Sequence, residues 1–359
     1  MITKLIIDNF KAIRHLELDL RPFQVFVGPN DSGKSTILQA LDILGRVSTS
    51  VIEPLVAGAS PSLFEERFER YLPHGDVNRA MHFKVHGTCD EGVYTYHIGL
   101  EAKSSSSSPH LASEELVVAD QTRIAGPGHF RNQSELSRLG ARFAGISADL
   151  RSFIAQFDPR KLAAPALLGA QLESDGTGLA SLVDDLLTAS DRQPLYEFEN
   201  QLRRFSSFIG GVSTHPTSDK HGKELLYSLA GTKRPISAKQ ASSGLVLVTA
   251  YLALRYGTGY RRYLIEEPEN GIHPHAASLV VQLLRELSLT GAQVLITTHS
   301  PLLLNQVAPE DVMVVTRHSD RGIQVKPMVE TKLFAERIRD FDLGELWYNI
   351  GEDELVAAS

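Results

Sequence analysis

The 359-residue sequence predicts an α/β fold, with a mixed β-sheet core assembled from the two ends of the chain. Strand-like segments within residues 1–28 lead into a glycine-rich turn and a helical pattern. Regular strand–helix alternation returns only after residue 240. The long segment between these ends is less regular, and a chain of this length has room for one large domain with an insertion. We therefore expect a single composite domain rather than two independent ones.

Composition and charge limit the classes of function that this protein can have. Hydrophobic residues make up 42% of the chain and charged residues 22%, which are ordinary globular values and exclude wholesale disorder. Because the net charge is -7, nucleic-acid binding stays open as an alternative but is not the default expectation. Cys89 is the single cysteine, so a reducing, cytoplasmic location is expected. The longest strongly apolar segment, residues 244–254, is about half the length of a membrane-spanning helix, so no membrane partner is expected.

The N-terminal region is predicted to form three strands and a helix. Residues 5–7 are apolar, residues 16–20 alternate as a half-buried strand does, and residues 23–27 are almost continuously apolar. Residues 35–44 carry apolar side chains at helical spacing. The third strand and the helix therefore flank the glycine-rich turn.

The middle of the chain is predicted to form two lobes. Residues 80–100 have an alternating strand pattern, the serine run 104–108 indicates a hairpin tip, and residues 115–119 are interpreted as the return strand. Residues 179–187 and 195–208 show helical periodicity. The expected organisation is a core of residues 1–48 and 235–330, an antiparallel, β-rich lobe of 50–160, a helical insertion lobe of 161–234 and a C-terminal tail of 331–359.

The C-terminal part restores the α/β pattern. After another predicted strand at residues 223–229, short apolar strands alternate with helical segments. The expected helices are residues 245–254 and 276–289, and the expected strands are residues 263–265, 294–297 and 312–316.

Residues 28–35, Gly-Pro-Asn-Asp-Ser-Gly-Lys-Ser, match the pattern G-x-x-x-x-G-K-[ST]. They follow a predicted strand and open a predicted helix, which is the context of the phosphate-binding loop of P-loop nucleoside triphosphatases. The glycines let backbone N–H groups approach phosphates, and the helix N-terminus favours negative charge. Lys34 would place a cation at the β- and γ-phosphates, and Ser35 would ligate Mg²⁺, so ATP and Mg²⁺ are the expected cofactors. The expected nucleotide-binding residues of this loop are Gly28, Pro29, Asn30, Asp31, Ser32, Gly33, Lys34, Ser35 and Thr36.

The predicted strand 263–265 ends in Glu266-Glu267-Pro268-Glu269-Asn270. Beside a phosphate loop, Glu266 is expected to face the Mg²⁺ shell, and Glu267 is expected to polarise a water for in-line attack on the γ-phosphate. By itself this motif would be equally compatible with an acidic loop that solvates a strand end.

Two weaker motifs accompany the phosphate loop and the acidic motif. His299, after the strand 294–297, is a candidate to bond the γ-phosphate or the attacking water, although alone it would be read as a satisfied buried histidine. Ser242, Ser243 and Gly244 open the helix before the acidic strand and form a candidate anion site, although Ser-Ser-Gly is also an ordinary helix cap.

The order of these motifs along the chain resembles the ABC-type ATPases of the SMC/RecF-like branch. The segment Asn9-Phe10-Lys11 resembles that branch's adenine-side loop, and residues 266–274, Glu-Glu-Pro-Glu-Asn-Gly-Ile-His-Pro, resemble one group almost residue for residue. That group comprises the stand-alone ATPases related to the overcoming-lysogenisation-defect nucleases and those of retron, Septu and PARIS defence systems. The resemblance covers residues 1–46 and 235–317 well and the middle only in outline.

The resemblance implies a head-to-tail homodimer, or a higher oligomer, with ATP at the interface. One subunit would supply Lys34, Ser35, Glu266, Glu267 and His299, and the other Ser242 and Gly244 across the nucleotide. It also implies Asn9, Phe10 and Lys11 as adenine-side residues. Some members of the group carry a Toprim nuclease domain after the ATPase. The residues that follow His299 are too few for one, so any effector is expected to be a separate protein.

The sequence departs from the pattern of the branch at two places. The signature is Ala-Ser-Ser-Gly instead of Leu-Ser-Gly-Gly-Gln, which weakens the argument for trans contacts, and Glu266 stands where many P-loop enzymes have aspartate. The glutamine of the loop that connects the lobes is not identified, with Gln121 and Gln156 as weak candidates.

Other polar features are interpreted conservatively. His273 and His275 lack a second ligand pair at zinc spacing, and His82 and His86 are expected on a solvated strand face. The C-terminal segment around Trp347 is expected to dock on its own core or on a partner, with a slight preference for a partner. The arginine-rich stretch, which is interpreted as a solvated face rather than a nucleic-acid site, comprises Arg123, Arg131, Arg138, Arg142 and Arg151.

Three functions remain open from the sequence. The leading hypothesis is an ATP-hydrolysing, dimerising switch that regulates a separate nuclease or toxin in prokaryotic antiviral defence. The alternatives are a DNA-repair or chromosome-associated ATPase that binds DNA directly, and an ATP-binding scaffold with little hydrolysis. The acidic charge and the absence of heptad repeats argue against direct DNA binding.

Overall fold

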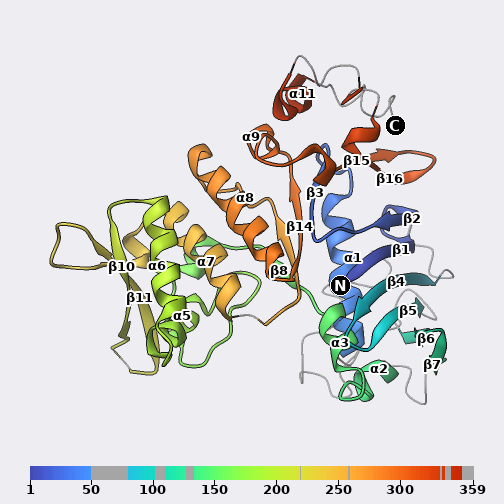
Figure 1. Ribbon diagram of the computed structural model, residues 1–359, viewed down its shortest axis with the longest axis horizontal. Coiled ribbons are helices and arrows are strands. Elements are labelled where there is room, and N and C mark those ends of the chain that lie inside the picture. The colour runs from blue at the N-terminus through green and yellow to red at the C-terminus, as the bar shows by residue number, and fades with distance from the viewer. Residues whose placement is uncertain are drawn as a thin grey trace.

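A computed structural model describes residues 1–49, 80–101, 110–126, 133–218, 220–257, 259–331, 334–335 and 341–349. The predicted serine hairpin tip and Arg131 lie outside these residues. The architecture has three sheets (Figure 1). A six-stranded sheet forms the centre, an antiparallel six-stranded sheet lies on one side of it, and a lobe of helices with a four-stranded sheet lies on the other.

The central sheet confirms the mixed α/β core that the sequence predicts. Its strand order is β16-β15-β3-β14-β13-β8, and β15, β3, β14, β13 and β8 run parallel while β16 is antiparallel. The bounds are β3 Phe23–Val27, β8 Phe153–Ala155, β13 Arg262–Glu266, β14 Gln293–Thr298, β15 Val312–His318 and β16 Gly322–Pro327. The edge strand β8 comes from the segment that the sequence assigned to the β-rich lobe.

The antiparallel sheet has the order β2-β1-β4-β5-β6-β7. The two N-terminal strands therefore pair with the β-rich lobe rather than with the core sheet, a pairing that their alternating pattern alone could not distinguish. The bounds are β1 Ile2–Phe10, β2 Ile13–Asp19, β4 Met81–Cys89, β5 Gly92–Glu101, β6 His110–Val118 and β7 Gln121–Ala125. Helices α1 Lys34–Thr49, α2 Glu135–Arg138 and α3 Ala144–Leu150 accompany this sheet.

The insertion lobe contains the predicted helices and the predicted strand 223–229, which is confirmed as β11, together with further strands that were not predicted. Its small sheet has the order β10-β11-β12, and β9 also pairs with β11. The strands are β9 Ala166–Leu167, β10 Ile209–Pro216, β11 Gly222–Leu229 and β12 Ile236–Ser237. The helices are α4 Pro159–Leu162, α5 Leu179–Thr188 and α6 Gln193–Phe205, and α7 Ser243–Gly257 and α8 Pro274–Leu289 join them to the central sheet.

Two hydrophobic cores lie on opposite faces of the central sheet, because successive residues of a strand point to opposite sides. Val25 and Ile265 pack with the insertion lobe, α7 and α8. Phe26 and Leu264 pack with α1 and the antiparallel sheet. The phosphate loop follows β3, a strand that contributes side chains to both cores.

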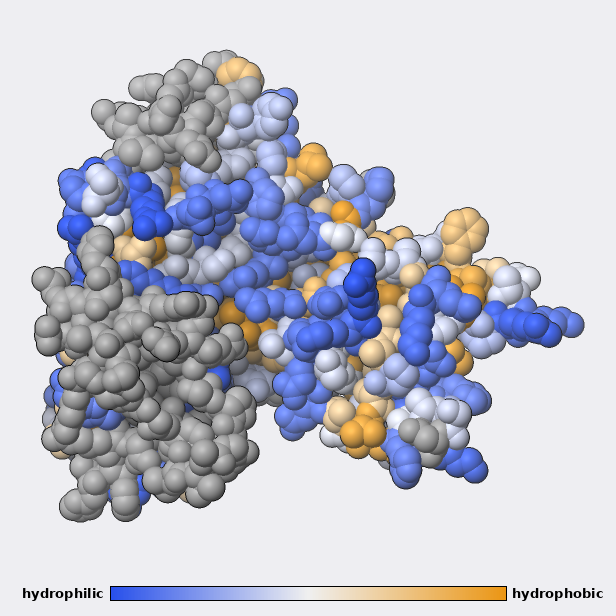
Figure 2. Space-filling model, turned by 180° about the vertical axis from the view of Figure 1, so that it is seen from behind, coloured by the Kyte–Doolittle hydropathy of each residue, from blue (hydrophilic) through white to orange (hydrophobic). Residues whose placement is uncertain are grey.

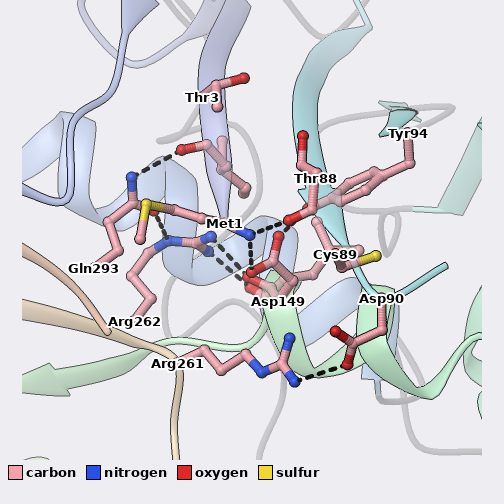
Figure 3. Close-up of polar contacts among 12 residues, drawn as sticks. Met1, Thr3, Thr88, Cys89, Asp90, Tyr94, Asp149, Arg261, Arg262 and Gln293 are labelled. Atoms are coloured by element: carbon pink, nitrogen blue, oxygen red, sulfur yellow. Dashed lines mark hydrogen bonds and ion pairs between the residues drawn. The ribbon is translucent and has the colours of Figure 1, made fainter. Parts of the chain in front are cut away.

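A buried arginine joins the two six-stranded sheets (Figure 3). Arg262, at the start of β13, is 1% exposed, and its guanidinium donates to the carbonyl oxygen of Asp149 at 2.7 Å and to Gln293 Oε1 at 3.0 Å. Gln293 Nε2 donates in turn to the carbonyl oxygen of Ile2 at 2.8 Å, in β1. These bonds fix the antiparallel sheet against the edge of the core.

The C-terminal segment docks on the chain's own core, contrary to the slight preference for a partner. Helix α11, Leu343–Asn349, packs on α9, Pro301–Leu304, with Leu343 and Leu346 buried. The Gly344 N–H donates to Asn305 Oδ1 at 2.6 Å. Intramolecular packing thus explains Leu343 and Leu346, and it partly buries Trp347.

The surface of the insertion lobe exposes several large apolar side chains, and orange patches gather on that lobe, at the right of Figure 2. The exposed large apolar and aromatic side chains of this lobe include Leu167, Leu168, Tyr196 and Phe208. Within the part of the chain that is described, no helix is long and apolar enough to cross a membrane.

Candidate functional site

The phosphate loop has the backbone that the motif predicts. It joins β3 to α1, and Gly33 has φ +104°, in the left-handed region that favours glycine. A Cβ on Gly28 would lie 2.3 Å from the carbonyl oxygen of Val315 in β15. These two glycines therefore let the loop lie close to β15 and β16.

Lys34 is buried inside this loop. Its Nζ donates to the carbonyl oxygens of Gly28 at 2.7 Å and Pro29 at 2.8 Å. Burial lowers the pKa of Lys34, and the attraction of Glu267 and Glu269 opposes that shift. Ser32 Oγ is buried with no hydrogen-bond partner among the described residues, so the loop holds both a cation and an unused polar group where phosphate would bind.

Ser35 and Glu266 lie next to each other as the expected metal-ligating pair. Glu266 ends β13, opposite Thr297 of β14, and its Oε1 is buried with no hydrogen-bond partner within the described residues. Burial raises the pKa of Glu266, while hydrogen bonding with Gln156 and Ser35 opposes the shift. A hydroxyl and an under-bonded carboxylate are suitable ligands for Mg²⁺.

The structure distinguishes between the two glutamine candidates. Gln156 directly follows β8, which pairs with β13, and its side chain reaches Glu266. Gln121 begins β7 in the antiparallel sheet. Of the two candidates, only Gln156 therefore lies at Glu266, a contact that depends on the pairing of the three-residue strand β8 with β13.

Glu267 and His299 face each other across the ends of β13 and β14. Glu267 Oε1 lies 3.2 Å from His299 Nδ1, and Asn270 Nδ2 donates to Glu267 Oε2 at 2.7 Å. Glu267 has φ +43°, an uncommon conformation that costs about 1–3 kcal/mol and is held by its N–H donating to Thr297 O at 2.9 Å. Backbone strain of this kind is concentrated at functional sites.

The acidic pair opens onto a hollow of about 320 Å³. Gln156, Phe157, Leu247, Tyr251, Glu266, Glu267 and Asn270 line it. The side chains of Glu267 and His299 are 33% and 48% exposed, so both can contact a ligand or solvent.

The Asn9–Lys11 loop lies beside α1. Asn9 and Lys11 both have positive φ, Asn9 Nδ2 donates to Ala80 O at 3.2 Å, and Lys11 Nζ donates to Gln39 Oε1 at 2.6 Å. Phe10 is fully buried against Phe83, so its ring anchors the loop and is not exposed to stack on an adenine. Of these three residues, Asn9 and Lys11 are partly exposed.

The Ser-Ser-Gly segment forms the exposed N-terminus of α7. Ser242 Oγ accepts from the Leu245 N–H at 3.3 Å as a helix cap, and Ser243 Oγ donates to Gly271 O at 3.3 Å. A Cβ on Gly244 would meet nothing closer than Phe205 at 3.8 Å. Ser242 and Ser243 are exposed, which leaves this helix end open to a second molecule.

The remaining polar features are surface contacts. Arg138 pairs with Glu135, and Arg142 and Arg151 lie over the rings of Phe143 and Tyr260. His82 Nδ1 lies 3.2 Å from His97 Nε2 on the outward face of the antiparallel sheet. No group of three or more His, Cys, Asp or Glu side chains is arranged for a metal ion in the described ranges.

Comparison with known proteins identifies the family. Residues 23–305 match the family described as "AAA domain, putative AbiEii toxin, Type IV TA system". The chain belongs to this family. The matched residues include the phosphate loop, both acidic residues and His299, whereas the Asn9–Lys11 loop lies before the matched range.

Two relatives are similar to this chain in sequence. The OLD nuclease of Thermus scotoductus (strain ATCC 700910 / SA-01) is 25% identical over 375 residues, which cover 96% of this chain and 68% of the nuclease. The DNA replication and repair protein RecF of Actinobacillus pleuropneumoniae serotype 5b (strain L20) is 31% identical over 108 residues, 30% of this chain and 25% of RecF.

Two SMC heads have similar folds. The SmcHead bound to the C-winged helix domain of ScpA matches with TM-score 0.60 at 15% identity, covering 90% of this chain and 96% of that one. The Smc head with an extended coiled coil, bound to the C-terminal domain of ScpA from Pyrococcus furiosus, matches with TM-score 0.58 at 14% identity, covering 90% and 95%. The fold is therefore that of an ABC-type ATPase head, as in these SMC heads.

Proposed function

We propose that this protein is an ATP-binding and ATP-hydrolysing switch that dimerises around nucleotide and regulates a separate nuclease or toxin in prokaryotic antiviral defence. The contact between Glu267 and His299, at the mouth of a phosphate loop whose Lys34 is already in place, carries the hydrolytic part of the proposal. The similarity to the OLD nuclease and the family description support the defence part.

Each residue of the site would have one role in hydrolysis. Lys34 and the loop amides would hold the β- and γ-phosphates, and Glu267 would accept the proton of the attacking water as a general base. His299, against Glu267 Oε1, would orient that water or the γ-phosphate. Ser35 and Glu266 would hold Mg²⁺, which supplies neutralisation of phosphate charge when it is bound.

Dimerisation would complete the site from a second copy. The α7 N-terminus, with Ser242 and Ser243 exposed, offers N–H groups to an anion. ATP that binds only the dimeric state would stabilise the dimer by mass action, and hydrolysis would release it. The Asn9–Lys11 loop would supply the adenine side.

The decisive experiment compares wild type with Glu267→Gln in ATP and Mg²⁺. We expect the variant to lose about 10²–10⁴-fold in single-turnover hydrolysis, the usual contribution of a general base, while it keeps ATP binding and accumulates as an ATP-bound dimer. Equal hydrolysis rates would refute the role of Glu267, and binding without turnover in wild type would favour the scaffold. Purification of the Glu267→Gln protein with ATP from its native host should retain the effector protein.

A second candidate function is a DNA-repair ATPase that binds DNA directly, which the RecF similarity favours. It predicts salt-sensitive binding of DNA and ATP turnover that rises when DNA is added. A net charge of -7 opposes it, so we expect turnover to be unchanged by DNA at physiological salt.

A further inference from the structure

A third carboxylate lies behind the reacting pair. Glu269 comes two residues after Glu267, where a turn carries the chain back toward the end of β14. The Asn270 N–H donates to Glu267 O at 3.0 Å, and the Ile272 N–H donates to Glu269 O at 3.1 Å. This turn directs the Glu269 side chain inward while Glu267 remains at the mouth of the site.

Glu269 holds the segment that carries His299. Its Oε1 accepts a hydrogen bond from Thr298 Oγ1, and the same Thr298 oxygen accepts from the Ser300 N–H at 3.0 Å. Thr298 and Ser300 are the two neighbours of His299. The Thr298 hydroxyl thus links the residues on both sides of His299 to the Glu269 carboxylate.

The environment of this carboxylate indicates a constrained role. Glu269 Oε2 is buried and has no hydrogen-bond partner within the described ranges. The charge of Glu269 acts on Lys34 of the phosphate loop and on Tyr251, a buried residue of α7. Burial of a carboxylate oxygen without a partner costs free energy, so a shape-matched apolar side chain would be the more stable choice if the position served stability alone.

We infer that Glu269 is a positioning residue for hydrolysis: by accepting the Thr298 hydroxyl it fixes the turn that carries His299, and so sets where His299 lies against Glu267. This inference rests on the proposed ATPase function. Glu269 does not contact the water or phosphate in this role. It acts through Thr298 and through its direct interaction with His299 and the His299 backbone, and its effect belongs to turnover rather than to nucleotide binding.

The test is a double-mutant cycle on single-turnover ATP hydrolysis, with Glu269→Ala, Thr298→Val and the double variant. We expect Glu269→Ala and Thr298→Val each to lower the rate constant by about tenfold or more, because a misplaced catalytic group costs at least this much. The ATP dissociation constant should stay within about threefold. The double variant should be no slower than the worse single variant, because both substitutions break the same bond.

Conservative replacement separates positioning from charge. Glu269→Gln keeps an oxygen that can accept the Thr298 hydroxyl, so it should retain at least about half of the wild-type rate. Glu114→Gln is a matched control, since Glu114 is a buried carboxylate that accepts hydroxyl groups of Tyr96 and Ser134 in or beside the antiparallel sheet. It should alter the melting temperature without altering the rate.

Three outcomes would overturn the inference: multiplicative losses in the double variant, a loss of ATP affinity that matches the loss of rate, or a Glu269→Gln variant as slow as Glu269→Ala. A wild-type protein that binds no ATP, or never hydrolyses it, would instead refute the proposed function. The two failures are therefore distinguishable in the same set of assays.

Discussion

At the scale of single residues, the site combines carboxylates with different environments. Glu267 is partly exposed and touches His299, whereas Glu266 and Glu269 are more buried and their pKa values are raised by burial. Environments that differ between neighbouring carboxylates allow them to do different tasks. The exposed carboxylate is the candidate base, and the buried ones are suited to binding a cation or holding a turn.

The raised pKa of Glu269 predicts a pH-dependent stability change. The folded state holds the Glu269 proton more tightly than the unfolded state, where the pKa is near the ordinary 4.5, so the free energy of unfolding decreases as pH rises from 4.5 through the folded value. We expect Glu269→Gln to raise the melting temperature at about pH 8, with the difference from wild type vanishing as pH falls toward about 4.

Thermal unfolding across that pH series is the measurement. Glu17→Gln is the control, because Lys4 lowers the pKa of the exposed Glu17 and the sign of its contribution is therefore opposite. A Glu269→Gln difference that is independent of pH, or that grows in acid, would contradict the prediction.

At the scale of elements, a close contact at Gly344 determines how helix α11 packs on helix α9. A Cβ on Gly344 of α11 would lie 2.1 Å from the carbonyl oxygen of Pro301 in α9, directly after Ser300. Helix α11 thus packs on the element that follows His299. Its sequence, with apolar residues near a tryptophan, could not show which surface it covers.

Gly344→Val should displace α11 from α9. Trp347, the single tryptophan, packs partly buried against the core, so its emission should shift to longer wavelength and the C-terminal segment should become easier to cleave by a protease. Tyr348→Ser, at a side chain that is 80% exposed, should change neither readout. Unchanged emission in Gly344→Val would mean that the helix does not depend on this close contact.

The joint between the two six-stranded sheets depends on Arg262. Arg262→Met would leave buried acceptors at Asp149, Leu150 and Gln293 without a donor, and we expect it to lower the free energy of unfolding by about 3 kcal/mol. Urea denaturation measures the change.

Arg261→Met is the neighbouring control for this substitution. Arg261 is 43% exposed and pairs with Asp90, which is 88% exposed (Figure 3), so the cost should stay below about 1 kcal/mol. Similar losses for the two variants would show that the buried network does not join the sheets.

At the scale of the whole molecule, the antiparallel sheet and the insertion lobe flank the central sheet, and the exposed N-terminus of α7 belongs to the core that contains the insertion lobe. We propose a division of the chain into a nucleotide-binding core, two lobes and a tail. Strands β1, β2 and β8 cross the boundaries that the sequence predicts for these parts, because β1 and β2 join the antiparallel sheet and β8 joins the central sheet. An ATP-dependent dimer would use the α7 end of one copy against the phosphate loop of another.

Gly244→Glu tests that arrangement. A Cβ at this position would make only ordinary van der Waals contacts, with Phe205 at 3.8 Å and Gly271 O at 3.9 Å, and an acidic residue suits the first turn of a helix. The free protein should therefore fold normally and bind ATP with unchanged affinity. A carboxylate opposite bound phosphates should abolish the ATP-dependent dimer of the Glu267→Gln protein, as measured by light scattering. Gly244→Ala should keep the dimer, and a dimer that survives Gly244→Glu would place the interface elsewhere.

The sequence by itself determined the local chemistry. The phosphate loop, the two adjacent glutamates and the helical and strand periodicities are encoded by nearby residues, because they depend on short-range backbone geometry and on side-chain spacing. The tertiary structure decided which strands pair, since pairing joins residues far apart in the chain: β1 and β2 enter the antiparallel sheet, and β8 brings Gln156 to Glu266. It also decided that Phe10 is buried and that Glu269 lies beneath His299, because burial and long-range hydrogen bonds exist only after the strand ends converge.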